Sequence, residues 1–187
     1  YMPIGRGPSF DMMITPEQRR QLWFREQHLM KDRGVFFIDF WNGGPISDGC
    51  ICAGRKGGYM YADWYGNVMP CVFIPYSVGN IKTDFFDKGK DLDDVLKTPF
   101  FTKMRKWQEV YSYKRPAAEA KNEIVPCPFR DHHDEFHRIA EETGAIPVGK
   151  TAETAFKDKK FVDDLTEIGK KAHEATNDLW VQEYQKM

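Results

Sequence analysis

The hydrophobic pattern near the N-terminal end predicts a helix followed by a strand. Thr15, Pro16 and Gln18 are typical of a capped helix start, and apolar residues then recur at helical spacing up to Gly34. The expected apolar face comprises Leu22, Leu29 and Met30. Residues 35–41 (VFFIDFW) are almost continuously apolar, which predicts a strand buried on both faces. One helix and one strand cannot form a sheet alone, so this segment is expected to be the tail of a larger α/β structure.

From residue 42 the pattern becomes that of a small irregular module. Tyrosines at 59 and 61 and the apolar residues from 68 flank the segment 63–67, where Gly66 and Asn67 supply the positive φ angles of a hairpin turn. Residues 77–81 are expected to add a short strand. Residues 92–111 are expected to be helical, with Pro99 opening a second helix after Thr98.

The pattern of the last third predicts helices. Residues 114–125 form a loop or contain one short helix, and Asp131 is expected to cap a helix that ends before Gly144. Residues 161–184 are amphipathic. Their apolar face comprises Phe161, Leu165, Ile168, Ala172, Leu179 and Trp180.

These elements indicate an α+β fold in three parts. Residues 1–41 are expected to be the last helix–strand unit of a larger α/β barrel or open sheet, residues 42–143 a small module built on a β-hairpin, and residues 144–187 a C-terminal helical extension. The boundary at residue 42 follows from the change of composition to Gly, Pro and Ser.

Charge and length exclude several classes of partner. The chain has 187 residues with 27 basic and 28 acidic side chains, a formal net charge of -1, so it has no basic field for nucleic acid or an anionic membrane. No apolar run approaches the roughly 20 residues that cross a bilayer. The N-terminus has neither a secretory signal pattern nor an initiator Met, which predicts a cytoplasmic protein and a truncated chain.

The four cysteines are unevenly distributed. Cys50, Cys52 and Cys71 lie close together in the sequence, and Cys127 follows between two prolines. A hairpin would bring Cys52 and Cys71 back towards each other, and converging thiolates favour zinc or an iron-sulfur cluster. Buried structural thiols and a disulfide remain the alternatives at this point.

Several sequence motifs resemble those of a known family. The segments 49–55 (GCICAGR), 59–73, 77–81, 92–101 and 126–131 together resemble the cluster-binding SPASM or "twitch" domains appended to radical S-adenosylmethionine (radical SAM) enzymes. The last two carry a Thr-Pro-Phe-Phe helix and a returning Pro-Cys-Pro motif. Residues 1–41 resemble the end of the preceding barrel.

The resemblance implies one auxiliary 4Fe-4S cluster held by Cys50, Cys52, Cys71 and Cys127. Four cysteines hold one cluster, whereas the full pattern has seven for two. The Cys-x3-Cys-x2-Cys loop that binds the SAM-cleaving cluster is absent from the sequence, so the chain alone is not expected to be catalytic, and S-adenosylmethionine would bind only in a complete enzyme. Cys52 stands where related sequences often carry a small residue. Its role decides between an electron relay and an open iron site that anchors substrate.

The partners implied are the missing barrel and a peptide or small-molecule substrate. The alternative function is a zinc-stabilised binding or structural module that uses the same cysteines. We also expect the strand at 35–41 to drive self-association, since unpaired strand edges seek partners.

Two histidines are a further candidate. His133 and His137 are four apart on an expected helix, beside Asp131 and Asp134, a spacing that suits a second metal as well as a plain polar helix face. Asp131 or His133 as an unusual cluster ligand is a third alternative. The aromatic residues Phe36, Phe37, Phe40, Trp41, Phe100 and Phe101 are expected to be core.

Overall fold

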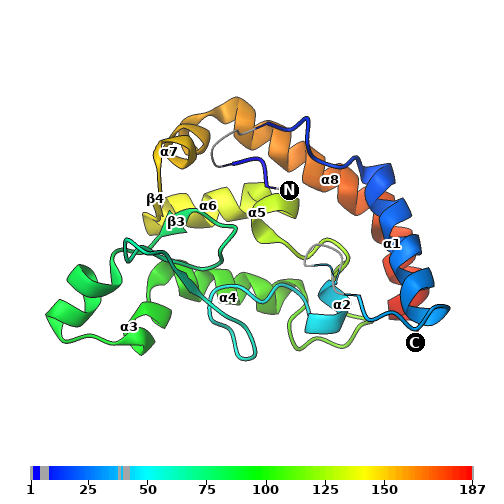
Figure 1. The fold of residues 1–187 in the computed structure, drawn as a ribbon, viewed down its shortest axis with the longest axis horizontal. Coiled ribbons are helices and arrows are strands. Elements are labelled where there is room, and N and C mark those ends of the chain that lie inside the picture. Colours follow the sequence, from blue (N-terminus) through cyan, green and yellow to red (C-terminus); the bar gives the residue numbers. More distant parts are fainter. Residues whose placement is uncertain (1, 5–8, 38, 40–42, 187) are drawn as a thin grey trace.

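The computed structural model describes residues 2–4, 9–37, 39 and 43–186 (Figure 1). Helices account for most of the regular structure in this part of the chain. The helices are α1 (Pro16–Lys31), α2 (Gly44–Ser47), α3 (Leu92–Leu96), α4 (Pro99–Tyr111), α5 (Pro128–Asp131), α6 (His133–Thr143), α7 (Lys150–Lys157) and α8 (Lys159–Trp180). The strands are β1 (Tyr61–Ala62), β2 (Val68–Met69), β3 (Tyr76–Ser77) and β4 (Ile146–Pro147). Shorter helical turns cover Ile81–Phe85, Phe86–Lys88 and Val181–Gln185.

Helix α1 begins as the sequence predicts but buries a different face. The Thr15 hydroxyl accepts the Gln18 N–H (3.2 Å) and the Gln18 side chain accepts the Thr15 N–H (2.8 Å), which confirms the capping box. The buried positions are Arg19, Trp23 and Glu26. The expected face of Leu22, Leu29 and Met30 is only half-buried. The reason is that α1 lies alongside α8 (Figure 1), and the buried Arg19 forms an ion pair with Asp131 at the end of α5.

The buried strand expected at 35–41 is wrong where the structure describes it. Residues 35–37 and 39 are not in a strand, and Val35 and Phe36 are 46 % and 83 % exposed. Positions 38, 40 and 41, including Phe40 and Trp41, lie outside the described residues. No described strand pairs with this segment, and an extended segment without a partner strand cannot satisfy its backbone groups in a core.

The hairpin is confirmed, with one difference in its turn. β1 pairs antiparallel with β2 in the register Tyr61 to Met69, and Gly66 adopts a φ of 87°. Asn67 does not adopt a positive φ. Its N–H donates to the Asp63 carboxylate (2.8 Å), and this side-chain hydrogen bond closes the turn.

The short strand expected at 77–81 is shifted towards the N-terminus. It is observed as β3, which pairs with β4. From Ile81 the chain turns helical because the Asn80 side chain caps the N–H groups of Lys82 and Thr83.

The helices of the second half follow the sequence, except near Asp131. α3 and α4 are separated before Pro99, and α6 ends at Gly144, which adopts a φ of 65°. Asp131 was expected to cap this helix but instead ends α5, because its carboxylate is buried in an ion pair with Arg19. Residues 114–125 form turns without a helix.

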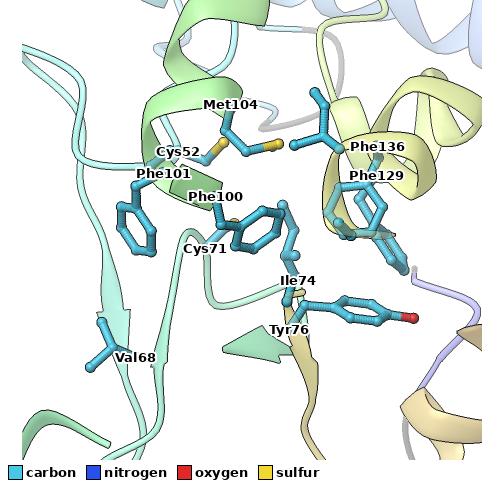
Figure 2. Close-up of a cluster of buried hydrophobic side chains, with 14 of the residues drawn as sticks. Cys52, Val68, Cys71, Ile74, Tyr76, Phe100, Phe101, Met104, Phe129 and Phe136 are labelled. Atoms are coloured by element: carbon cyan, nitrogen blue, oxygen red, sulfur yellow. The ribbon is translucent and has the colours of Figure 1, made fainter. Parts of the chain in front are cut away.

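One core joins the hairpin to the helices. Figure 2 shows Val68, Ile74 and Tyr76 facing Phe100 and Phe101 of α4, while Phe129 and Phe136 approach from α5 and α6. Leu165 of α8 closes this core. The observed fold is therefore α+β, and the described strands do not form a barrel. Among the described residues, no helix has the length and apolarity required to cross a membrane.

Candidate metal centre

The hairpin places Tyr59 and Cys71 opposite each other. Continuing the register of β1 and β2 by two pairs beyond Tyr61 and Met69 brings these two residues into line. The Tyr59 hydroxyl lies 2.8 Å from Cys71 Sγ. The Phe73 N–H also contacts this sulfur, at 3.5 Å. Cys71 is thus fixed at the exit of the hairpin with its thiol turned inwards.

Cys50 and Cys52 lie on a segment that is bonded to both sides of the hairpin. The Ala53 N–H donates to the Pro70 carbonyl (2.8 Å), and the Tyr59 N–H donates to the Ile51 carbonyl (2.9 Å). These bonds bring Cys52, which is 1 % exposed, towards Cys71. In an irregular segment, such bonds replace the ladder of a sheet.

Arg55 fixes the loop around Cys50. Its guanidinium donates to the Cys50 carbonyl (2.7 Å) and to the Ser47 carbonyl. It also stacks 4.1 Å above the ring centre of Tyr113. A buried guanidinium bonded to several carbonyls holds a loop that has no regular structure of its own.

Cys127 is held by a buried ion pair. Cys127 itself is extended (φ −78°, ψ 116°) and caps α5, which Pro128 opens; its Sγ accepts the Arg130 N–H (3.4 Å). The Cys127 N–H donates to Asp131 Oδ2 (3.2 Å). Asp131 in turn accepts from Arg19 Nη1 (2.6 Å) and Arg130 Nε (2.9 Å). The Arg19 guanidinium also donates to the Ile124 carbonyl (2.8 Å), so α1 clamps the loop before Cys127.

The fold brings the four thiols into one region. Cys52, Cys71 and Cys127 belong to the same buried core, and Cys50 packs against it. Figure 2 shows Cys52 and Cys71 beside Phe100, Phe101 and Met104. Hydrogen bonding to Cys50, burial, and the charges of Cys50, Cys71 and Cys127 all raise the pKa of the Cys52 thiol. All four are free thiols, so the disulfide alternative is not realised.

The environment of the thiols disfavours negative charge. Burial raises the pKa of the Cys71 thiol to about 11 and that of Cys127 well above its ordinary value. The bond with Cys50 and burial raise the pKa of Cys52, while the same bond lowers that of Cys50. Thiolates here require a cationic partner, which a metal supplies. Because the described thiols are not grouped to hold a single metal ion, the donor set of four thiols from three segments suits a larger iron-sulfur cluster better than one soft metal.

Three residues around the thiols escaped the sequence reasoning: Tyr59 as a sulfur contact, Gln108 and Arg19. Gln108 Nε2 lies 3.2 Å from Cys52 Sγ. Signals for two of them were present. The hairpin register places Tyr59 opposite Cys71, and Gln108 is the polar member of the buried stripe on α4. Arg19 had no such signal, because its partner Asp131 is 112 positions away.

The histidine candidates are engaged elsewhere. His133 is 2 % exposed, its Nδ1 lies 2.7 Å from the Phe129 carbonyl, and burial lowers its pKa to about 4. The expected polar helix face is therefore wrong at His133, which is core. His137 Nε2 lies 3.0 Å from the Phe156 carbonyl. Asp131 is occupied by two arginines, so it is not placed as a cluster ligand. Within the described ranges, no three or more His, Cys, Asp or Glu side chains are grouped to hold one metal ion.

A cavity of about 640 Å³ adjoins the thiol region. Its walls include Phe73 and Arg130, whose backbone amides contact Cys71 and Cys127. The other side is formed by the N-terminal segment, including Met12 and Asp39. The cavity is largely apolar and has a few charged lining residues, which is the usual character of a small-molecule site.

Comparison with known families agrees with the resemblance predicted from the sequence motifs of this region. Residues 50–121 match the family model of SPASM, an iron-sulfur cluster-binding domain. The predicted resemblance is thus confirmed for this segment, which is of the SPASM type and indicates iron-sulfur cluster binding. The match contains Cys50, Cys52 and Cys71 and ends before Cys127. No curated protein and no solved structure matches the chain.

Proposed function

We propose that Cys50, Cys52, Cys71 and Cys127 hold one 4Fe-4S cluster that serves as an auxiliary cluster of a radical SAM enzyme. The observation that carries this proposal is the position of Cys52. It is buried in the same core as Cys71 and Cys127, two positions from Cys50, in a segment of SPASM type. Four ligands to four irons leave no open iron site, which favours an electron relay over direct anchoring of substrate.

The chain's own residues would support such a relay in three ways. Arg55 and the Asp131 ion pair hold the loops that carry the thiols. The apolar core around Phe100 and Phe101 keeps water away from the centre. When bound, the cluster would supply one-electron transfer, and the adjoining cavity would receive a peptide or small-molecule substrate.

The missing partner in this proposal is the SAM-cleaving barrel, to which residues 1–41 would belong. The exposed side chains of Val35 and Phe36 support such a partner, because a surface residue as apolar as Phe36 is rarely left 83 % exposed without one. In the isolated chain the same residues would drive self-association. Sedimentation should then show dimers that Phe36→Ser disrupts, and a monomer at all concentrations would contradict this part of the proposal.

The cluster itself is tested by metal analysis of anaerobically reconstituted protein. We expect a brown protein with about four irons and equivalent sulfide per chain. A colourless protein with one zinc would establish the alternative of a zinc-stabilised module, and a protein without metal would establish plain buried thiols.

Cysteine variants then test the ligand set. Cys50→Ala, Cys71→Ala and Cys127→Ala should each lose most of the iron, because a ligand removed from a cluster also removes the folding energy coupled to it. Cys52→Ala should do the same if the centre has four thiolate ligands, whereas retained iron would indicate an open site. Val72→Ala is the matched control, since this neighbour of Cys71 is 47 % exposed and should keep its iron. Iron retained in Cys127→Ala would overturn the arrangement.

A further inference from the structure

Two polar side chains face the thiols. The Tyr59 hydroxyl lies 2.8 Å from Cys71 Sγ, and Gln108 Nε2 lies 3.2 Å from Cys52 Sγ. The tyrosine comes from the segment just before β1 and the glutamine from α4, so separate parts of the fold bring them to two different sulfurs. Neither is explained by ligation or by capping of regular structure.

The direction of the tyrosine hydrogen bond follows from the chemistry of a ligand sulfur. The contact between the Tyr59 hydroxyl and Cys71 Sγ by itself allows either atom to donate. A metal-bound thiolate carries no proton and can only accept, so Tyr59 is the donor in the loaded protein.

The direction of the glutamine hydrogen bond follows from the same kind of argument. Gln108 Nε2 also lies 3.0 Å from the Cys52 carbonyl oxygen, which can only accept. The NH2 group of the side chain is therefore turned towards Cys52 and reaches both its carbonyl and its sulfur. Gln108 is 2 % exposed, so water does not compete for this bond.

We propose that Tyr59 and Gln108 set the reduction potential of the cluster by donating hydrogen bonds to two of its thiolate ligands. This rests on the proposed function. Uptake of one electron makes the centre more negative, and a donor aimed at a ligand sulfur stabilises the reduced state more than the oxidised state. The apolar surroundings strengthen the effect, because electrostatic interactions are larger where the dielectric is low. In the reaction, one electron passes from a reductant such as dithionite to the centre, and no bond to the protein forms or breaks.

Tyr59→Phe tests the proposal with the least disturbance, because it removes one hydroxyl and keeps the ring. The variant should retain its iron and sulfide. Its midpoint potential, measured by redox titration followed with electron paramagnetic resonance, should fall by about 59 mV, equivalent to a roughly tenfold weaker one-electron reduction equilibrium. Gln108→Met should shift the potential in the same direction.

Tyr113→Phe is the matched control. The Tyr113 hydroxyl donates to the Lys56 carbonyl (3.0 Å), so this variant also loses a tyrosine hydrogen bond but none to sulfur. Its potential should equal that of the unmodified protein. An equal shift in Tyr113→Phe and Tyr59→Phe would overturn the proposal, because the change would then be a general effect of losing a hydroxyl.

A measurement on the unmodified protein covers the case in which Tyr59→Phe does not fold. The reduced protein should show a strongly coupled exchangeable proton by electron–nuclear double resonance, which is lost in D2O. Absence of that proton, or an unchanged potential in iron-loaded Tyr59→Phe, overturns this inference and leaves the cluster proposal standing. A failure of the unmodified protein to bind iron and sulfide overturns both.

Discussion

The thiol-bearing region and the C-terminal helix α8 are stabilised by different interactions. Residues 50–81 contain strands of two residues, held by side chains such as Arg55 and Asp63 that bond to backbone groups of the neighbouring loop and turn. Helix α8 has 22 residues, is capped by the Asp158 side chain and buries a stripe that includes Leu165 and Leu179. One region depends on specific side-chain hydrogen bonds, and the other on its own repeating pattern.

The regular region supports the irregular one where they meet. Gly169 of α8 lies so close to α5 that a Cβ at this position would come within 2.4 Å of the Asp131 carbonyl oxygen. At this close contact α8 packs directly against the segment that holds Cys127. The comparison indicates that a rigid helix serves as the platform on which a marginal, ligand-dependent site is positioned.

The largest expected effect concerns Asp131, which connects the two regions. Asp131→Asn should destabilise the protein by about 3–5 kcal/mol, because it leaves the buried guanidinium groups of Arg19 and Arg130 without their carboxylate. Denaturant unfolding of the iron-free protein measures this directly. Asp134→Asn, at an exposed position on α6, is the control and should be neutral. A loss in Asp131→Asn no greater than in the control would show that the ion pair does not join the regions.

The next effect separates the regions by their dependence on iron. Leu165 is 0 % exposed, and Leu165→Ala should cost about 2–5 kcal/mol through lost burial and a cavity. Because α8 does not need the ligand, this loss should be the same with and without iron. Cys71→Ala should reduce stability mainly in the loaded protein. The exposed Leu92 provides the control Leu92→Ala. If Leu165→Ala reduced stability only in the iron-loaded protein, α8 would depend on iron like the thiol-bearing region, and the comparison would be wrong.

A smaller effect depends on pH and involves Glu123. Burial raises the pKa of this carboxyl to about 7 from an ordinary value of 4.5, against a hydrogen bond from Ser112. A raised carboxyl pKa means that ionisation of Glu123 opposes folding. The neutral carboxyl therefore stabilises the folded protein fully below pH 4.5, and this stability is lost as the pH rises through 7. Glu123→Gln should abolish this slope and make the protein more stable at pH 8 by on the order of 2 kcal/mol.

Thermal unfolding between pH 5 and pH 8 measures the Glu123 effect. The exposed Glu119 provides the control Glu119→Gln, which should keep the slope of the unmodified protein. If Glu123→Gln and the unmodified protein lose stability in parallel as the pH rises, Glu123 is not the group responsible.

The smallest effect is expected on the surface of α6. Arg138 bonds to Glu135 and Glu142 at 2.7 Å each, but its side chain is 54 % exposed. Arg138→Ala should therefore change the unfolding midpoint by no more than the error of measurement, since exposed ion pairs contribute little. If Arg138→Ala clearly lowers the unfolding midpoint and this loss disappears in 1 M salt, then ion pairs stabilise the helical region as well as apolar packing.

Local sequence signals predicted the local structure well. The capping box at Thr15, the break before Pro99 and the end of α6 at Gly144 were all correct, because each depends on residues within one or two turns. The segment 35–37 was wrong for the opposite reason. Its apolar pattern is that of a buried strand, but a strand is buried only when neighbouring strands exist to pair with it.

The sequence by itself determined most of the helices, the hairpin, the four cysteines and the SPASM-type motifs of residues 50–121. Only the tertiary structure decided what surrounds the thiols. Arg19 reaches Asp131 across 112 positions, and Gln108 reaches Cys52 across 56. Periodicity and capping act over a few residues, whereas these contacts depend on how α1, α4 and α5 pack together. Side chains so far apart in the chain meet only after the core has formed, so no local pattern specifies their pairing.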